Sequence, residues 1–314
     1  MNIQNFLNNI FFNIKFLYII KMNNSLNIVN EIKDINNIYN NENWMLNYQN
    51  KSIINLIIPG SHNSFALKFK SFSHNDLNLP KIFNPYIKLW AKTQNKTITE
   101  QLNMGIRYFD IRVEEYNNIY YTVHSLLSIE LNNILNEILN FIINHPSEKI
   151  IIDINHLYNI TNYNNLQEYL LNKFNEYLID NNISNFTKPI SEVQGNIYLF
   201  YTIDNNKIFP NNLINSIWYD TNNINNLCNN IINETLQPNK LNICQCILTP
   251  KTEDILNGIF FFFFFPISLK SLTEKNNDEM MITLNNISKN KNIIIKDFVD
   301  EDFINLCINS NNKN

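Results

Sequence analysis

The stretch Leu56-Ile57-Ile58-Pro59-Gly60-Ser61-His62-Asn63-Ser64 decides how the rest of the chain is interpreted. It closes an apolar run, Ile53 to Ile58, which predicts a buried strand that Pro59 stops. His62 and Asn63 lie on the turn that follows. An α/β barrel keeps its chemistry where buried strands end in such polar turns, although a capped surface loop fits this stretch alone about equally well.

The composition narrows the class of protein. The chain has 314 residues, 45% of them hydrophobic, which suffices for one large domain or two modest ones. A net charge of -4 and a pI of about 5.8 do not suggest a nucleic-acid surface. The four cysteines lack metal-ligand spacing. We therefore interpret them as reduced core thiols, with Cys244 and Cys246 on opposite faces of a strand.

Arginine is rare in this chain, and its placement is informative. Arg107 and Arg112 are the only arginines, and both fall on a predicted strand, residues 106–113. Lysine would supply charge equally well, whereas a planar fork for a phosphate or a carboxylate is supplied only by arginine. The period of two along a strand places Asp110 and Arg112 on one face and Arg107 on the other.

Residues 1–40 form an Asn-rich, low-complexity N-terminal arm, and residues 41–314 carry the predicted barrel. The apolar part of the arm, Phe6 to Ile20, is too short and too polar for a transmembrane helix. No clear signal peptide is visible, although secretory targeting by residues 1–20 stays open. We expect a cytoplasmic protein with peripheral membrane association.

Strand and helix patterns alternate along the rest of the chain and predict an α/β fold, a (β/α)8 TIM-like barrel that is closed, distorted or incompletely closed. The eight strand candidates are residues 53–58, 106–113, 119–123, 149–153, 195–203, 214–219, 241–248 and 292–296. Polar residues gather at or just after their C-terminal ends: His62, Arg112, His124, Asp153, His156, Asp204, Asp220, Lys251 and Asp297. In a parallel barrel these ends form one rim, the mouth.

Two histidines, an arginine and a carboxylate around a mouth suit acid–base chemistry at a phosphorus atom. One histidine takes a proton from an attacking hydroxyl, and the other gives a proton to the leaving oxygen. The arginine holds the phosphoryl oxygens, and an aspartate orients the basic histidine. No Gly-rich phosphate loop or Cys/His metal cluster in the sequence competes with this interpretation.

Several motifs together resemble one family, the phosphatidylinositol-specific phospholipase C X domain-containing proteins. The resemblance covers about Trp44 to Ile308, with ordered motifs on the predicted strands. These motifs are Ile58-Pro59-Gly60-Ser61-His62-Asn63-Ser64, Gly105-Ile106-Arg107-Tyr108-Phe109-Asp110-Ile111-Arg112-Val113, Val123-His124-Ser125, His145-Pro146-Ser147-Glu148, Asp153-Ile154-Asn155-His156, Leu248-Thr249-Pro250-Lys251 and Lys296-Asp297-Phe298-Val299.

The resemblance implies a role for each catalytic candidate. His62 would be the general base for the inositol 2-hydroxyl, supported by Asp297. Arg112 would bind the phosphate, and His124 would protonate the diacylglycerol oxygen. Asp110 would hold the arginine or histidine network. The implied substrate is phosphatidylinositol, or a glycosylated relative, in a phospholipid bilayer. The products would be diacylglycerol and a 1,2-cyclic inositol phosphate.

Asn63 departs from the metal-free members of the family, which usually have an aspartate there that helps the acid step. Asparagine resembles the calcium-dependent members instead, but those have an acidic residue where this chain has Arg112. A guanidinium repels a calcium ion, so we predict no metal and keep calcium as the disfavoured alternative. The predicted substrate-binding residues are Asn63, Asp110, Asp153, His156 and Lys251.

Two other functions stay open. A catalytically impaired inositide- or membrane-binding module would keep the fold, and Asn63 is the reason to consider it. A glycerophosphodiester hydrolase would need a carboxylate-bound metal, and its Glu-Asp ligands beside the first histidine are missing. The phenylalanine run Phe260 to Phe265 fits a lipid-dipping loop and low-complexity drift equally well.

Overall fold

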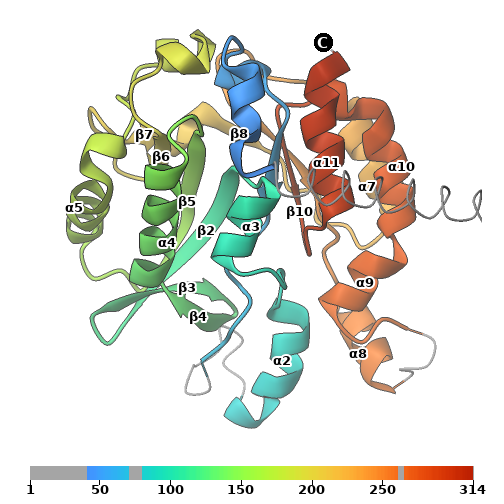
Figure 1. The fold of residues 1–314 in the computed structure, drawn as a ribbon. Helices are drawn as coiled ribbons and strands as arrows, with labels where there is room; N and C mark the ends of the chain where they lie inside the picture. The colour runs from blue at the N-terminus through green and yellow to red at the C-terminus, as the bar shows by residue number, and fades with distance from the viewer. Residues whose placement is uncertain (1–40, 71–79, 261–264, 314) are drawn as a thin grey trace, which may run out of the picture. The chain divides into compact units, whose positions relative to one another are not determined.

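Parallel strands lie side by side around a barrel, in the order in which they occur in the sequence (Figure 1). A computed structural model describes residues 41–70, 80–260 and 265–313, so the predicted arm and Phe261 to Phe264 lie outside the described residues. The unit that carries the barrel spans Glu42–Asn314. The strands are β1 (Ile58–Ser61), β2 (Tyr108–Tyr116), β3 (Ile119–His124), β4 (Leu126–Glu130), β5 (Ile150–Tyr158), β6 (Ile197–Tyr201), β7 (Phe209–Pro210), β8 (Ile214–Ser216), β9 (Leu241–Cys246) and β10 (Ile293–Lys296).

The barrel is open along one seam. Within the described ranges the parallel strands follow the path β7-β6-β5-β2-β1-β10-β9-β8, and its two ends, β7 and β8, do not pair with each other. The predicted α/β barrel with incomplete closure is therefore confirmed. Short connections of 3-10 type (η) supplement the helices, including η1 (Asn41–Tyr48), η2 (Ile53–Asn55) and η3 (Lys81–Phe83). The helices are α2 (Asn84–Ala91), α3 (Ile98–Met104), α4 (Leu131–Asn144), α5 (Tyr163–Phe174), α6 (Ser184–Thr187), α7 (Ile224–Asn233), α8 (Thr252–Phe260), α9 (Leu269–Lys275), α10 (Asn277–Ile287) and α11 (Glu301–Ser310).

One predicted barrel strand has a different role. Residues 119–123 do form a strand, β3, but it pairs antiparallel with the far end of β2 and then with β4, outside the parallel path. The eighth barrel strand is β7, only Phe209–Pro210, which is too short to produce a recognisable pattern in the sequence. The return of β3 matters for the site, because it brings His124 back to the mouth.

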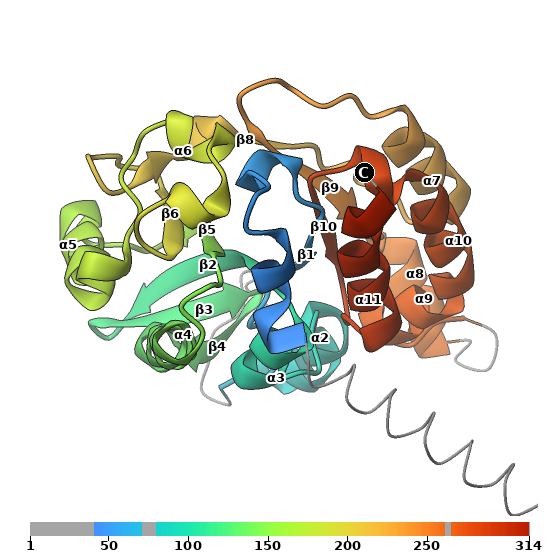
Figure 2. The same cartoon turned by 45° about the horizontal axis from the view of Figure 1, so that its top comes forward.

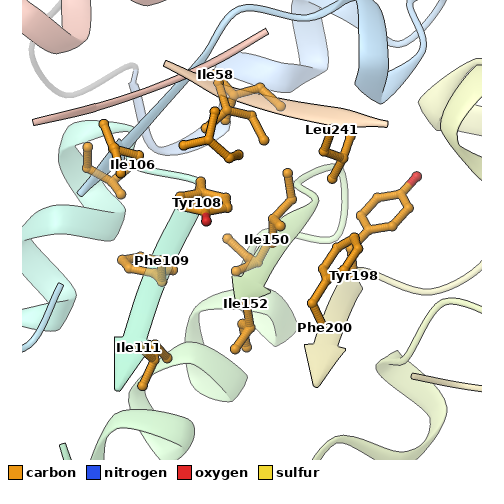
Figure 3. Close-up of a cluster of buried hydrophobic side chains, with 14 of the residues drawn as sticks. Ile58, Ile106, Tyr108, Phe109, Ile111, Ile150, Ile152, Tyr198, Phe200 and Leu241 are labelled. Atoms are coloured by element: carbon orange, nitrogen blue, oxygen red, sulfur yellow. The ribbon is translucent and has the colours of Figure 1, made fainter. Parts of the chain in front are cut away.

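Apolar side chains from both faces of the central strands form the core. Every residue of β1 is buried, as are those of β6 and β10, which is expected of parallel strands covered on both faces. Figure 3 shows side chains from β1, β2, β5, β6 and β9 meeting in one buried cluster. Gly60 is required in β1, since an added Cβ would lie 2.8 Å from Ile295 and 2.9 Å from Tyr108.

The helices cover the outside of the strands. Figure 2 shows α7, α10 and α11 beside β9 and β10, with α4 and α5 on the side of β5. The four cysteines are free and buried, as predicted. The prediction that Cys244 and Cys246 face opposite ways was wrong, because residues two apart in a strand share a face, and their Sγ atoms lie 3.9 Å apart.

Arg107 holds the end of the barrel opposite the mouth. Its guanidinium is fully buried, and its Nε donates to Glu148 Oε2 at 2.8 Å. Its other nitrogens donate to backbone carbonyls of Leu102, Ile106 and Glu42. The guanidinium of Arg107, directly before β2, thus binds a carboxylate of the protein itself.

We expect Arg107→Ala to lower the free energy of unfolding by about 3–5 kcal/mol, because it strands the buried Glu148 carboxylate without its cation. Urea unfolding followed by circular dichroism measures this change. A loss below about 1 kcal/mol, which is typical of an exposed ion pair, would contradict the structural role assigned to Arg107.

Candidate active site

His62 is held where β1 and β10 end side by side. Ser61 and Lys296 are register partners at the ends of these strands, so the next residues, His62 and Asp297, are neighbours. The Nδ1–H of His62 donates to Asp297 Oδ1 at 2.7 Å, and the backbone N–H of His62 donates to the Lys296 carbonyl at 3.2 Å. A carboxylate can only accept, so the proton of the neutral imidazole sits on Nδ1. The basic lone pair is therefore on Nε2.

The side chain of Asn63 caps this lone pair. Asn63 Nδ2 lies 2.9 Å from His62 Nε2, in the arrangement of an amide N–H donating to an unprotonated ring nitrogen. The amide oxygen of Asn63, Oδ1, is buried without a hydrogen-bond partner within the described residues. For His62 to accept a proton from a substrate, this amide must leave Nε2.

Asp110 connects the histidine to β2 and β5. Its carboxylate accepts the backbone N–H of Asn63 at 2.9 Å and the amide of Asn155 at 2.6 Å, and it lies 3.9 Å from His62 Nε2. Burial opposes ionisation, but His62, Arg112 and these hydrogen bonds together keep the pKa of Asp110 below its usual value. Asp110 is thus a negative charge held in place close to His62.

His124, the last residue of β3, lies next to His62. Its ring centroid lies 6.2 Å from that of His62, with the planes at 70°. Its Nδ1–H donates to the carbonyl of Ala91 at 2.7 Å, which leaves Nε2 for the mouth. Burial, with the nearby charges of Arg112 and His62, lowers the pKa of His124 to about 3. The ring is therefore neutral near pH 7.

Arg112 places a positive charge near His124 and His156. Within the described part of the chain its guanidinium has no hydrogen-bond or ion-pair partner, and its Nε is buried. Its charge contributes to the lowered pKa values of His124 and His156. An unpaired guanidinium beside two imidazoles is suited to bind a phosphate in a bidentate manner.

Comparison with known proteins finds relatives in sequence and in fold. The family described as phosphatidylinositol-specific phospholipase C, X domain, matches residues 69–197. Human PI-PLC X domain-containing protein 2 is 29% identical over 247 residues, which cover 70% of this chain and 81% of the relative. Human PI-PLC X domain-containing protein 3 is 26% identical over 235 residues, or 66% of this chain and 73% of the relative.

The chain is thus similar in sequence to the PI-PLC X domain-containing proteins. Solved structures with a similar fold are phosphatidylinositol-specific phospholipases C from bacteria. The enzyme from Staphylococcus aureus superposes with a TM-score of 0.65 at 19% identity, covering 86% of this chain and 97% of that enzyme. The enzyme from Listeria monocytogenes superposes with a TM-score of 0.61 at 20% identity, covering 86% of this chain and 98% of that enzyme.

The backbone at the mouth is strained at three equivalent places. Asn63 (φ 39°), Ser125 (φ 57°) and Phe298 (φ 50°) are left-handed, and none is glycine. Each directly follows one of the site residues His62, His124 and Asp297. Such strain is retained where surrounding contacts enforce it, and it concentrates at functional sites.

The other predicted site residues lie in different surroundings. Asp153 is buried, accepts the hydroxyl of Tyr108 at 2.6 Å and has a pKa raised by burial to about 7. His156 is the register partner of Arg112 on β5 and is exposed. Lys251 lies beyond β9, where its Nζ pairs with Asp220 Oδ1 at 2.7 Å.

Several polar residues at the site were not predicted from the sequence. Asn155 bridges Asp110 and Asp153, and the adjacent Asp153 and His156 were the only signal for it. Thr93 and Gln94, fully buried beside the site, carry no recognisable motif and lie in the connection after β1. Within the described ranges, no cluster of three or more His, Cys, Asp or Glu side chains is arranged to hold a metal ion.

Proposed function

We propose that this protein is a phosphodiesterase that cleaves phosphatidylinositol, or a glycosylated relative, into diacylglycerol and a 1,2-cyclic inositol phosphate. The unpaired guanidinium of Arg112, whose charge acts on His124, and the adjacent rings of His62 and His124 carry this proposal. His62 Nε2 takes the proton of the inositol 2-hydroxyl, whose oxygen attacks the phosphorus. Arg112 binds the phosphoryl oxygens, and His124 protonates the departing diacylglycerol oxygen.

Protonation of His124 depends on the substrate. Its pKa is lowered to about 3 by burial and by the charge of Arg112. A phosphodiester anion bound to Arg112 offsets that charge and favours the imidazolium form. Binding of the substrate anion therefore favours protonation of His124, the acid that cleavage of the same substrate requires.

The mouth is next to a surface suited to a lipid bilayer. Ile82, Phe83, Tyr86 and Leu89 on η3 and α2 are exposed, with Ile82 78% exposed. The last residue of α2, Ala91, contacts His124, so this apolar surface adjoins the site. We propose peripheral membrane association of a cytoplasmic protein through this surface. None of the described helices is long and apolar enough to cross a bilayer.

Turnover of phosphatidylinositol vesicles, with products identified by mass spectrometry, tests the proposed reaction. We expect diacylglycerol and the cyclic phosphate to appear at equal rates with EDTA and with calcium, since Arg112 supplies the positive charge at the phosphate. Activity that requires calcium would contradict the metal-free mechanism. Absence of both products would contradict the phosphodiesterase assignment.

A non-catalytic inositide-binding module is the second candidate. It is favoured by the hydrogen bond from Asn63 to the basic nitrogen of His62, because this contact must break before catalysis. Vesicle binding that depends on Arg112, without either product, would support this function.

We expect Asn63→Asp to shift the acidic limb of the pH–rate profile upward by about one unit. A carboxylate 2.9 Å from Nε2 would stabilise the imidazolium of His62 in place of its neutral form. On the alkaline side of that limb, turnover should rise about tenfold, because a carboxylate, unlike an amide, can help to transfer a proton. Kinetics from pH 5 to 9 measure both effects. An unchanged pH–rate profile would contradict the contact between Asn63 and the base.

A further inference from the structure

We propose that Gln94 is a positioning residue that holds His62 and Asp297 in their hydrogen-bonded arrangement. Its side chain is fully buried and lies between the ends of β1 and β10. Its Nε2 donates to the carbonyl of His62 at 3.1 Å and to that of Lys296 at 3.0 Å. Its Oε1 accepts the backbone N–H of Val299 at 3.1 Å. One amide thus bonds to both strand ends that carry the pair.

Thr93 makes parallel contacts to the strained turns. It is also fully buried, and its hydroxyl donates to the carbonyl of Asn63 at 2.9 Å. Its own carbonyl accepts the N–H of Phe298 at 2.7 Å. Asn63 and Phe298 are the left-handed residues that follow His62 and Asp297. Thr93 therefore bonds to the backbone at both strained positions, and such positions need surrounding contacts to persist.

The Ala91–Gln94 segment also reaches the third group of the site. The carbonyl of Ala91 accepts the Nδ1–H of His124 at 2.7 Å. Within four residues the chain therefore contacts the backbone of His62, the backbone on both sides of Asp297 and the ring of His124. These three groups come from β1, β10 and β3, and this segment sets their relative positions.

The chemistry at position 94 requires an amide of this length. A glutamine offers two N–H donors and an acceptor, and here it uses both functions. Methionine would keep the shape and lose every hydrogen bond. Because a displacement of about 1 Å in a catalytic group can lower turnover about 100-fold, loss of these bonds should reduce kcat while substrate binding at Arg112 persists.

Gln94→Met tests the inference, and Gln101→Met is the matched control. Gln101 is equally buried and donates to the carbonyls of Ser64 and Lys96, without touching His62 or Lys296. Two readouts are compared: the hydrogen-bonded Nδ1–H proton of His62 in NMR spectra, and kcat against KM on phosphatidylinositol. Thr93→Val is a second variant if Gln94→Met does not fold, since it removes only the bond to Asn63.

We expect Gln94→Met to weaken or abolish the Nδ1–H signal and to lower kcat about 10- to 100-fold with KM within threefold of wild type, whereas Gln101→Met changes neither. Equal behaviour of the two variants would overturn the inference. The kinetic half rests on the proposed function, but the NMR half does not. A wild-type protein without turnover would therefore contradict the function, and the His62 signal would still decide the role of Gln94.

Discussion

Replacement of His62 by alanine is expected to slow diacylglycerol release from phosphatidylinositol about 1,000-fold. The Nδ1–H of His62 donates a 2.7 Å hydrogen bond to Asp297, which holds the ring with its basic lone pair on Nε2, the atom that accepts a proton from the substrate in the proposed mechanism. A positioned general base typically contributes 100- to 10,000-fold. Initial rates on vesicles of phosphatidylinositol, at equal protein and lipid concentrations, give the ratio.

His145→Ala is the matched control for this experiment. His145 follows α4 and precedes β5, so it lies at the opposite end of the strands from the mouth, where it stacks on Phe141. Its loss should leave turnover within about twofold of wild type, because it touches none of the reacting groups. If His62→Ala released diacylglycerol as fast as His145→Ala, the acid–base mechanism would be refuted.

Arg112→Ala should reduce kcat by about 100- to 1,000-fold, which is the effect of removing one strong donor from a developing oxyanion. Arg112→Lys should recover only part of this loss, because lysine restores the charge without the planar fork. Both variants should unfold at the wild-type temperature, since the guanidinium makes no hydrogen bond or ion pair within the described chain.

Arg107, directly before β2, and Arg112, within it, therefore make a paired experiment. Arg107→Ala should lose stability, whereas Arg112→Ala should lose turnover. If Arg112→Ala was destabilised as strongly as Arg107→Ala, its guanidinium would have a structural role like that of Arg107. Thermal unfolding and vesicle assays on the same two preparations separate these outcomes.

Local signals predicted most of the barrel because buried parallel strands are continuous apolar runs. The run at Ile150 is of this kind. The first strand was predicted at 53–58 and was misplaced, because Ile53–Asn55 forms a 3-10 turn and β1 is Ile58–Ser61, which includes Pro59 and Gly60. The predicted number of barrel strands was right although one member was wrong. The strand at 119–123 looked like a barrel strand because its pattern does not encode antiparallel pairing, and β7 was missed because two residues carry no period.

The site could be predicted only in part. His62, Arg112 and His124 were predicted at the mouth because each lies at or just after the C-terminal end of a predicted strand, and the structure brings them together. The contacts that orient them are long-range: Gln94 binds the carbonyl of Lys296, 202 residues away. Every residue has a backbone carbonyl, so a single sequence does not indicate which carbonyl a buried side chain binds.

The open seam between β7 and β8 has a consequence for self-association. An incompletely closed barrel keeps two edge strands, and exposed edges can template pairing with other copies of a chain. Here both edges are blunted, because β7 is Phe209–Pro210, whose proline lacks an N–H, and β8 is only Ile214–Ser216. The barrel can therefore stay open along this seam without exposing a long strand edge with which another copy of the chain could pair.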